Sequence, residues 1–302
     1  MRALLNLQFI DAIARAASIR QAAEALSITP SALNRRLFAT AEELGVQIFE
    51  RLARGVRLNA AGEVLIHHIR SQLSDFERVK SQIADLSGAR RGHVSIACSQ
   101  ALLPTFLPEQ IELYRQAHPA VSFRVLLRDR AAAEEAISDF SADLALVFEP
   151  IRTTDFHTLA TVPQAVCAVM DRSHPLAEKK TLRLRDCLAY PMALPSLPYG
   201  VRQLLVHAAA SLDRKISAAV ESDSFEFLRM ATVGTDLITF QIEIGLPSEG
   251  RQNPLVSRPI DARDIGFGAL HLGHLRGRVL PIAVGRFADQ VTKTLSTRYG
   301  TG

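Results

Sequence analysis

The sequence predicts an α/β protein with an all-α beginning, a long linker helix and a larger remainder in which strands alternate with helices. Three patterns support this: apolar residues at helical spacing before residue 46, one apolar stripe over residues 60–87, and alternating strand and helix signals after residue 93. The 302 residues suffice for about two domains of roughly 150 residues each. With 48% hydrophobic and 22% charged residues, the composition is that of a globular protein.

The excess positive charge lies in the first part of the chain. Residues 1–92 hold 13 Lys and Arg against nine Asp and Glu, whereas residues 93–302 hold 22 of each, so the net charge of +4 belongs to the first third. A basic segment joined to a neutral one favours contact of the first segment with a polyanion, while the second does other work.

Targeting and metal signals are weak throughout. No apolar run reaches the roughly 20 residues that a membrane-spanning helix needs, and Asp11 interrupts the apolar patch at the beginning of the chain. Cys98, Cys167 and Cys187 lie far apart and form no metal-type pair. We therefore expect a cytoplasmic protein with free thiols, no membrane association, no metal and no cofactor.

Two helices are expected before residue 27. Apolar residues at helical spacing predict the first helix over residues 4–16. Ser18 followed by Gln21 is a capping-box pattern, so a second, short helix begins near Ile19.

A third helix follows after "SIT". Thr29 is a good N-cap, Pro30 suits the first helical position, and Gly45 ends the helix. Together the second and third helices have the helix-turn-helix layout, in which the second of the pair enters the major groove of DNA. The expected buried stripe of the third helix is Leu33, Leu37, Thr40 and Leu44.

A β-ribbon wing is expected next, because "QIFER" and "VRLN" have the pattern of two short strands around "LARG". Arg51, Arg54 and Arg57 cluster there. Such a wing contacts phosphates or the minor groove, which positions a protein on DNA without specifying the sequence.

A long helix follows Asn59, which caps it, and is expected over residues 60–87. A lone helix of this length has too little protein around it to cover an apolar stripe, so its simplest partner is the same helix of a second chain. Residues 87–93 are expected to form a hinge. His67 and His68 have no further ligand at metal spacing. The stripe, close to a heptad seam, consists of Leu65, Ile69, Leu73, Phe76, Ile83 and Leu86.

The remaining two-thirds predicts parallel sheets covered by helices on both faces. The first run of strands is "HVSIAC", "VSFRVLLRD" and "ADLALVF", with helices between them. A second run begins at "QAVCAVM" and includes "FEFLRMATVG" and "TDLITF", and "VLPIAVGRFADQVTKTLSTRY" closes the chain as a strand and a helix. Nowhere does the sequence contain GxSxG, a P-loop, HExxH or GxGxxG, so it offers no catalytic motif.

The segment "AAEALSITPSALNRRLFATAEELGVQIFERLARGVRLNAAGEVLIHH" resembles the DNA-binding segment of LysR-type transcriptional regulators. The likeness includes "ALNRR", "EELGVQIFER", the Arg-Leu of the wing and "AGE". A looser likeness runs through "RRGHVSIACSQALLPTFLPEQIELYRQAHPAVSF", "ADLALVF" and "DRSHPLA", so it covers essentially the whole chain. The sequence departs from the family at Phe38, Thr40 and Ala41, where Arg, Leu and Glu are more usual, and at "VGTDLITFQIEIGLP", which replaces a glycine-rich segment.

The resemblance implies three parts: a winged helix-turn-helix DNA-binding domain over residues 1–59, a dimerising linker helix with a hinge over 60–92, and a two-lobed effector domain like a periplasmic binding protein over 93–302. Members of this family usually assemble as dimers or tetramers on two-fold-related sites in double-stranded DNA. A small molecule bound between the lobes changes promoter output. The implied lobes are lobe one at 93–162 and 267–302, and lobe two at 163–266.

Candidate DNA contacts lie on the third helix and the wing. Arg35 can pair bidentately with guanine and Asn34 with adenine, and hydroxyls at the start of the helix would reach phosphates. Arg36 would touch the DNA backbone or pair with glutamates, and Phe38 would lie against thymine methyl groups or pack on the protein. The full set is Thr29, Ser31, Asn34, Arg35, Arg36, Phe38, Arg51, Arg54 and Arg57.

Candidate effector contacts follow the strands, because ligands of open α/β sheets bind beyond the carboxyl ends of the strands. Ser99 and Gln100 follow the first strand and precede a helix, so they could hold a carboxylate. Arg128 follows the next strand and Phe148 the one after. Together, Arg128 and Arg202 slightly favour an anionic effector, although a cap, loop or surface role stays open for each candidate. By resemblance, lobe two adds Ser196, Tyr199 and Ser224.

The prediction is therefore a ligand-responsive, homo-oligomeric transcription factor, with no catalytic residues. Two alternatives rest on the α/β lobes alone: a solute-binding protein, or a small-molecule enzyme on a similar scaffold. A solute-binding protein would have no use for residues 1–92, and the sequence shows no signal peptide that would export one. An enzyme would need a catalytic motif, and the sequence offers none.

Overall fold

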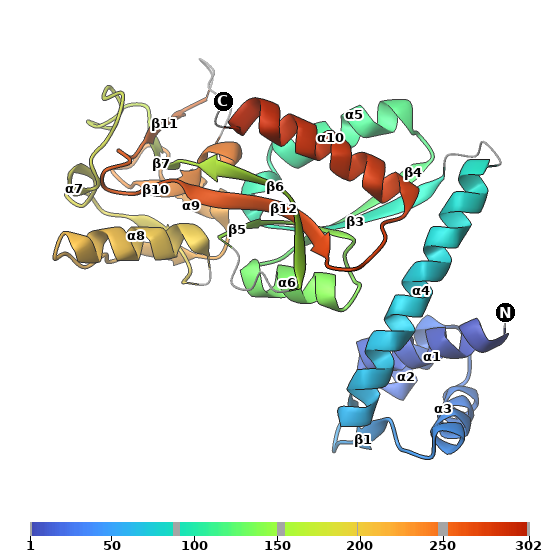
Figure 1. Cartoon of the computed structure of the whole chain (residues 1–302). Helices are drawn as coiled ribbons and strands as arrows, with labels where there is room; N and C mark the ends of the chain where they lie inside the picture. The colour runs from blue at the N-terminus through green and yellow to red at the C-terminus, as the bar shows by residue number, and fades with distance from the viewer. Residues whose placement is uncertain (1, 87–90, 150–154, 198, 247–252, 301–302) are drawn as a thin grey trace. The chain divides into compact units, whose positions relative to one another are not determined.

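The computed structural model of the chain has two compact units, Met1–Ile83 and Ala84–Gly302, and each is described by itself. Figure 1 labels their helices and strands. The structure describes residues 2–86, 91–149, 155–197, 199–246 and 253–300.

The first unit contains three short helices, a β-ribbon and most of a long helix. The two strands of the ribbon pair antiparallel, with Glu50 opposite Arg57. The elements are α1 (Arg2–Ala16), α2 (Ile19–Ala25), α3 (Pro30–Leu44), β1 (Phe49–Arg51), β2 (Val56–Leu58) and α4 (Ala60–Leu86).

The predicted boundaries of α2 and α3 are confirmed by their caps. The Ser18 hydroxyl accepts a hydrogen bond from the backbone N–H of Gln21 at 3.4 Å. At the start of α3, the Thr29 hydroxyl accepts from the N–H of Ala32 at 3.3 Å. Gly45 ends α3 with a left-handed φ of 69°, a conformation that costs glycine nothing.

The predicted buried stripe of α3 is correct at Leu33, which is fully buried, and wrong at Leu44, which is 48% exposed. A helix turns once in 3.6 residues, so the buried face after Leu37 continues to Ala41 rather than to the last turn. Ala41 packs in a core cluster with Ile48 and neighbouring apolar residues of α1 and α4.

The wing lies against the turn between α1 and α2. The backbone N–H of Val56 donates to the carbonyl of Ala17 at 2.9 Å. Gly55 has a φ of +87°, and a Cβ there would lie 2.3 Å from the same carbonyl oxygen. Because no other residue fits so close an approach, the glycine of "LARG" determines where the ribbon packs.

The long helix α4 begins as predicted, since the Asn59 side chain accepts from the N–H of Gly62 at 2.8 Å. Its first turns are covered by the unit itself: Ile66 and Ile69 are buried against α1 and the residues before the wing. Further along, Phe76, Val79 and Ile83 are exposed. The expectation of an uncovered stripe therefore holds only for the second half of the helix. Leu65 and Leu73 are partly buried, while the side chain of Leu86 and residues 87–90 of the expected hinge lie outside the described residues.

The second unit contains a first lobe built on a five-stranded sheet in the order β4-β3-β5-β12-β6. Strands β3, β4 and β5 are parallel, whereas β12 runs antiparallel to β5 and β6. Helices α5 and α10 cover one face and α6 the other (Figure 1). The elements are β3 (Gly92–Cys98), η1 (Gln100–Leu102), α5 (Phe106–Ala117), β4 (Val121–Leu127), α6 (Arg130–Ser138), β5 (Leu144–Phe148), β6 (Phe156–Gln164), β12 (Gly268–Leu275) and α10 (Ile282–Tyr299).

The second lobe is built on a three-stranded sheet in the order β10-β7-β11 and a parallel pair, β8-β9. Both neighbours of β7 run antiparallel to it. The elements are β7 (Val166–Asp171), α7 (Leu184–Cys187), β8 (Ala193–Pro195), α8 (Gly200–Ser211), β9 (Val220–Ser222), α9 (Phe225–Ala231), β10 (Thr239–Ile242), η2 (Glu243–Gly245) and β11 (Leu255–Pro259).

The expectation of wholly parallel sheets is wrong in both lobes, and in lobe two both β10 and β11 run antiparallel to β7. Residue 165 alone separates β6 in the first lobe from β7 in the second, so the chain changes sheet without a crossover helix. The returning strand β12 then enters the first sheet antiparallel. The predicted strand at "VLP" is absent: Val279 is exposed and Pro281 is the N-cap of α10.

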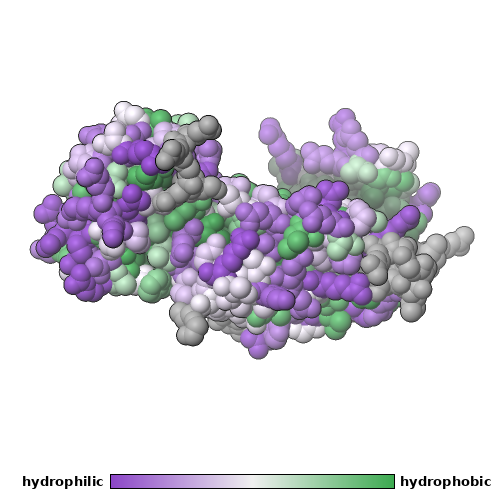
Figure 2. All heavy atoms as spheres, turned by 90° about the horizontal axis from the view of Figure 1, so that it is seen from above, coloured by the Kyte–Doolittle hydropathy of each residue, from purple (hydrophilic) through white to green (hydrophobic). Residues whose placement is uncertain are grey.

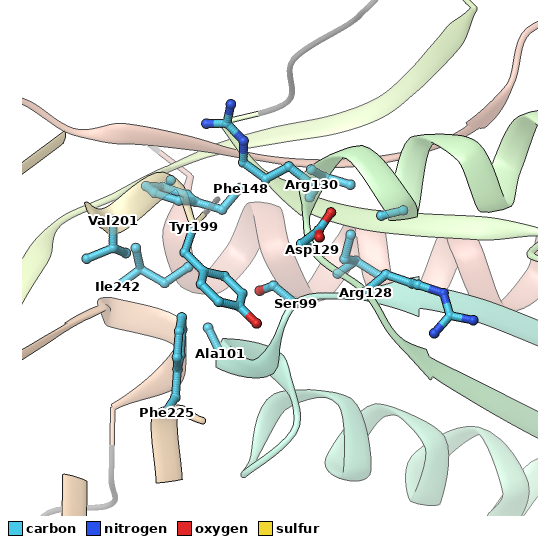
Figure 3. A pocket seen from close by; sticks show the side chains of 14 residues that line it. Ser99, Ala101, Arg128, Asp129, Arg130, Phe148, Tyr199, Val201, Phe225 and Ile242 are labelled. Carbon is cyan, nitrogen blue, oxygen red and sulfur yellow. The ribbon is translucent and has the colours of Figure 1, made fainter. Parts of the chain in front are cut away.

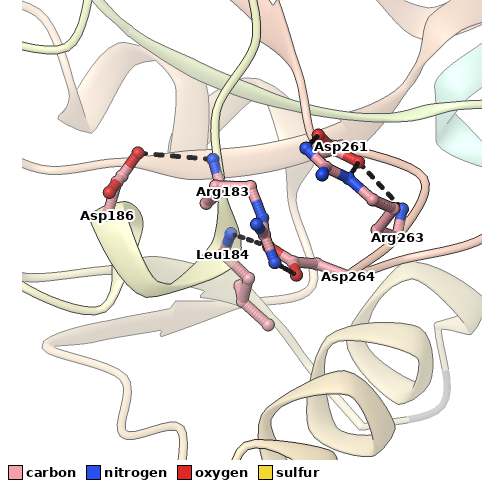
Figure 4. A network of polar contacts seen from close by, with 6 residues as sticks. All are labelled: Arg183, Leu184, Asp186, Asp261, Arg263 and Asp264. Carbon is pink, nitrogen blue, oxygen red and sulfur yellow. Dashed lines mark hydrogen bonds and ion pairs between the residues drawn. The ribbon is translucent and has the colours of Figure 1, made fainter.

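A buried carboxylate joins the start of α7 to the turn after β11 (Figure 4). Asp264, whose side chain is 2% exposed, accepts hydrogen bonds from Arg183 Nε at 2.8 Å and Nη2 at 2.5 Å. It also accepts from the backbone N–H of Leu184 at 2.7 Å. Nearby, Asp261 pairs with Arg263 at 2.6 Å. This set of bonds holds together segments of lobe two that are about 80 residues apart in the chain.

Seen from above, hydrophilic side chains cover much of the surface, and hydrophobic ones gather in scattered patches (Figure 2). Among the described helices, none has the length and apolar character needed to cross a membrane. The described residues also contain no group of three or more His, Cys, Asp or Glu placed to hold a metal ion.

Candidate DNA-binding face and effector pocket

One face of α3 brings together the side chains predicted to meet DNA. Ser31, Arg35 and Phe38 are exposed, and Asn34 between them is half-buried. The spacing of three or four residues places these positions on one side of the helix, opposite the fully buried Leu33. Phe38 is 48% exposed, which is unusual for a phenylalanine and puts an aromatic ring beside the polar groups.

Three of the predicted contacts at α3 have a partner within the protein. The Thr29 hydroxyl is the N-cap of α3 and lies 3.2 Å from the Ser31 hydroxyl. Arg36 packs against α1, where its Nη1 donates to Asn6 Oδ1 at 2.8 Å. The Arg36 guanidinium also lies 4.8 Å from the centre of the Phe9 ring, a cation–π contact. Both Arg35 and Arg36 are exposed, but Arg36 also joins two helices of the protein.

The wing carries three exposed arginines, as predicted, but they differ in surroundings. Arg57 is paired across the ribbon with Glu50 at 2.7 Å. Arg51 and Arg54 lie at the end of β1 and in the turn, and both are exposed. The two positions nearest the tip of the ribbon are thus better placed to meet phosphates than Arg57.

A pocket lies between the two lobes of the second unit (Figure 3). Its walls come from the ends of β3 and β5 and the start of α6 in lobe one, and from the starts of α8 and α9 and the end of β10 in lobe two. The empty volume is about 390 Å³, part of which is open to solvent. Most of the wall is apolar, and it includes the ring of Phe148 from lobe one and the rings of Tyr199 and Phe225 from lobe two.

The structure brings four of the seven predicted effector contacts to this pocket. Ser99, Arg128, Phe148 and Tyr199 are part of its lining. The other three have local roles in the protein, and none of them is in the lining. The Ser224 hydroxyl caps α9 by accepting from the N–H of Phe227 at 3.2 Å, the Ser196 backbone N–H donates to the carbonyl of Ser222 at 3.2 Å, and the Gln100 side chain binds groups of lobe two.

The arginines around the pocket do not point to its centre. Arg128 and Arg130 extend away from it (Figure 3); Arg128 Nη1 donates to the Leu127 carbonyl at 2.9 Å, and Arg130 reaches Gln203 Oε1 at 3.0 Å. Arg202 is buried elsewhere, 3.8 Å from Glu221. The two arginines that favoured an anionic effector therefore do not present their guanidinium groups to the pocket.

Sequence reasoning missed the apolar half of this wall. Phe225 and Ile242 of lobe two line the pocket. The N-cap signal of Ser224, which places Phe225 at the start of a helix, was available in the sequence. Nothing local marks Ile242, because it is one of several apolar residues in a buried strand.

Asp129 lines the pocket as well and was not predicted. Its carboxylate is the N-cap of α6 and accepts from the N–H of Ala132 at 2.9 Å. Its side chain and that of Ser99 both belong to the lining (Figure 3). The polar groups nearest the centre are thus hydroxyls and one carboxylate that is already hydrogen-bonded.

Comparison with known proteins agrees with both units. Residues 4–63 match the family of bacterial regulatory helix-turn-helix proteins of the lysR type, and residues 87–296 match the LysR substrate binding domain. Among curated relatives, the HTH-type transcriptional activator CmpR of Synechocystis sp. is 24% identical over 252 residues, which cover 83% of each chain.

Two solved structures share the fold. A full-length OxyR variant from Pseudomonas aeruginosa superposes with a TM-score of 0.72 at 18% identity, covering 95% of this chain and 94% of that one. Full-length CbnR in complex with its target DNA gives a TM-score of 0.64 at 16% identity, covering 96% and 99%. With a helix-turn-helix match near the beginning and a substrate-binding-domain match over most of the rest, the chain belongs to the LysR family of DNA-binding transcriptional regulators.

Proposed function

We propose that this protein binds a two-fold-related DNA site as a homo-oligomer, through α3 and the wing, and that a small molecule held between the lobes of its second unit changes its regulatory output. The observation that carries the DNA-binding part is the exposed face of α3, where Ser31, Arg35 and Phe38 lie together beside Asn34. The match to a substrate-binding domain and the pocket between the lobes support the effector part.

On this face each side chain has a distinct role. Arg35 reads guanine through two parallel hydrogen bonds, and Asn34 reads adenine. Phe38 lies against a thymine methyl group or a deoxyribose. Arg51 and Arg54 of the wing bind phosphates, which sets the position of the protein on the duplex without adding sequence information.

Pairing of two chains through α4 supplies the two-fold symmetry. Phe76, Val79 and Ile83 form an exposed apolar stripe on the second half of this helix, and a second copy of the same stripe would cover it. We keep the division into a DNA-binding domain over 1–59, a linker over 60–92 and an effector domain over 93–302.

We further propose that the protein regulates rather than catalyses. The alternatives of a solute-binding protein and of an enzyme use only the second unit, and neither explains a helix-turn-helix with an exposed reading face. The pocket supports binding of a compact molecule with an apolar body, because aromatic and aliphatic side chains make most of its wall.

A gel-shift experiment with the promoter region upstream of the protein's own coding sequence tests this function. The full-length protein should shift this DNA in the presence of excess non-specific competitor, and a panel of metabolites should change the affinity or the pattern of the complexes. No specific shift, with or without metabolites, would contradict the proposed function.

A further inference from the structure

The side chain of Gln100 connects the two lobes. It lies in η1, directly after β3 of lobe one, and all three of its partners belong to lobe two. Its Nε2 donates to the Tyr199 hydroxyl at 3.0 Å and to the backbone carbonyl of Asp223. Its Oε1 accepts from the backbone N–H of Phe225 at 2.9 Å. We call this set of three hydrogen bonds the Gln100 clasp.

The clasp matches the chemistry of a primary amide. Phe225 is the first residue of α9, so its N–H has no acceptor within the helix. The Ser224 cap satisfies a different group, the N–H of Phe227. Phe225 thus needs an acceptor, and the carbonyl of Asp223 accepts from Gln100 as well as from the Tyr199 hydroxyl, which lies at 3.3 Å. Glutamine supplies both the acceptor and a donor from a single planar group. A carboxylate at this position would keep the acceptor and lose the donor.

Two of the three partners of the clasp are walls of the pocket. The rings of Tyr199 and Phe225 meet edge to face, with centroids 4.9 Å apart, and both line the pocket opposite Phe148 of lobe one (Figure 3). Gln100 is not part of the lining itself. It therefore affects the pocket indirectly, by holding Tyr199 and Phe225 in place.

Other contacts between the lobes are compatible with this closed arrangement. Gly200 lies so close to Phe148 that a Cβ would be 3.0 Å from its ring. Gly245 lies equally close to Ala101, the neighbour of Gln100. These close approaches limit how near the lobes can come to each other. The clasp adds three hydrogen bonds between the lobes, beside the one from Arg130 to Gln203 Oε1 at 3.0 Å.

We propose that Gln100 is a positioning residue of the effector pocket: its clasp holds the lobes together and sets Tyr199 and Phe225 in place before any effector binds. Since an effector binds only the fraction of molecules with an assembled pocket, loss of the clasp lowers apparent affinity by that fraction. A closed population of one tenth, for example, would weaken binding about tenfold. This consequence rests on the proposed function, whereas the clasp itself does not.

Amide hydrogen exchange of the full-length protein, without DNA or effector and resolved to single residues, tests the clasp. The Phe225 amide should be protected in the wild type and should exchange about tenfold faster in Gln100→Ala. The Leu228 amide, bonded to the carbonyl of Ser224 at 3.1 Å within α9, serves as internal reference and should not change. Gln100→Glu keeps the acceptor and should retain protection at Phe225, a rescue that general loosening of the fold would not give.

Gln116→Ala is the matched control, because Gln116 is an exposed glutamine on α5 in the same lobe. It should leave the Phe225 amide as protected as in the wild type. An unprotected Phe225 amide in the wild type, or equal protection in Gln100→Ala, would overturn the proposal.

Distances between spin labels give a second measurement. Cys98, Cys167 and Cys187 are buried, and burial raises the pKa of each thiol to about 12, so labels will react at introduced surface cysteines. Ala131→Cys on α6 and Ala210→Cys on α8 place one label on each lobe, and both positions are exposed. The distance distribution should be narrow with Gln100 and broader with Gln100→Ala.

An unchanged distribution in Gln100→Ala would contradict the clasp. Because neither measurement uses DNA or an effector, this outcome leaves the proposed regulatory function standing. Conversely, a failed gel shift together with a protected Phe225 amide would remove the proposed function and leave the clasp.

Discussion

At the scale of single residues, neighbouring arginines on α3 have different surroundings although their sequence context is the same. Arg35 faces solvent on the side away from Leu33, whereas Arg36 is bonded to Asn6 and packs on Phe9 of α1. A sequence can mark both as basic residues of a helix. Only the position of α1, fixed by contacts some 30 residues away in the chain, separates them.

Arg35→Ala should weaken specific DNA binding by roughly 1–3 kcal/mol, because one bidentate base contact is lost. The melting temperature and the oligomeric state should not change. Equilibrium titration of a specific and a scrambled duplex measures the effect, and equal affinity of mutant and wild type for the specific duplex would show that the reading face is wrongly placed.

Arg36→Ala is the matched variant and should lower the stability of the fold rather than the affinity for DNA. Loss of its hydrogen bond to Asn6 and of its contact with Phe9 should lower the free energy of unfolding by about 1 kcal/mol. Specific affinity per folded molecule should stay near the wild-type value. Chemical denaturation alongside the same DNA titration checks this, and a large loss of specific affinity with unchanged stability would assign Arg36 to the DNA.

Phe38→Ala should weaken binding to a selected site by about 1 kcal/mol through loss of apolar contact with a thymine methyl group. Replacing single thymines by uracil removes that methyl group from the DNA instead. The wild type should be sensitive to one such replacement in each half-site, and Phe38→Ala should not. If the wild type tolerates every replacement, Phe38 does not read a thymine methyl.

At the scale of elements, helix starts and the wing are predictable because their signals are local. Ser18, Thr29 and Asn59 each form the cap expected from the sequence. The position of Gln100 shows the limit of local signals. Its partners lie about 100 residues or more away in the chain, so no short pattern could place them together.

Acid should destabilise lobe two through Asp264. The hydrogen bonds from Arg183 hold the pKa of this carboxyl below its usual value. A group whose pKa is lower in the folded state contributes stability above its unfolded pKa of about 3.9 and loses it as the pH falls through the folded value.

Below about pH 4, the free energy of unfolding of Asp264→Asn should therefore fall less steeply with decreasing pH than that of the wild type. At neutral pH, Arg183→Ala should lower the free energy of unfolding, because it leaves a nearly buried carboxylate short of partners. Thermal unfolding across a pH series measures both effects. An Asp264→Asn profile parallel to that of the wild type would show that the network does not govern acid stability.

The exposed half of α4 should hold two chains together. Ile83→Glu places a charge on its apolar stripe, where Ile83 is 61% exposed in the single chain, and should shift the protein towards monomers. Gln72→Glu, at an exposed polar position of the same helix, should leave the oligomer intact. Analytical ultracentrifugation distinguishes these outcomes, and an unchanged Ile83→Glu oligomer would place the interface elsewhere.

At the scale of the whole molecule, alternation of strands and helices predicted the class of the second unit but not the directions of its strands. The direct step from β6 to β7 at residue 165 leaves no room for a crossover helix. In the sequence this step is "TVPQAV", close to the passage between lobes that the resemblance implied, but nothing there marks the directions of the strands on either side. Ser99, Arg128 and Phe148, chosen because they follow strands, all line the pocket, since the strand-end rule depends on topology rather than on contact detail. Tyr199, chosen by resemblance, lines it as well.

The central claim, that α3 reads base pairs as part of a symmetric assembly, is tested most directly by selecting binding sites from random duplex DNA with the full-length protein. Wild-type protein should enrich a two-fold-related sequence, and Arg35→Ala should lose preference for guanine at one position of each half-site while keeping the rest of the pattern. Enrichment of no sequence, or an identical pattern from Arg35→Ala, would contradict the account.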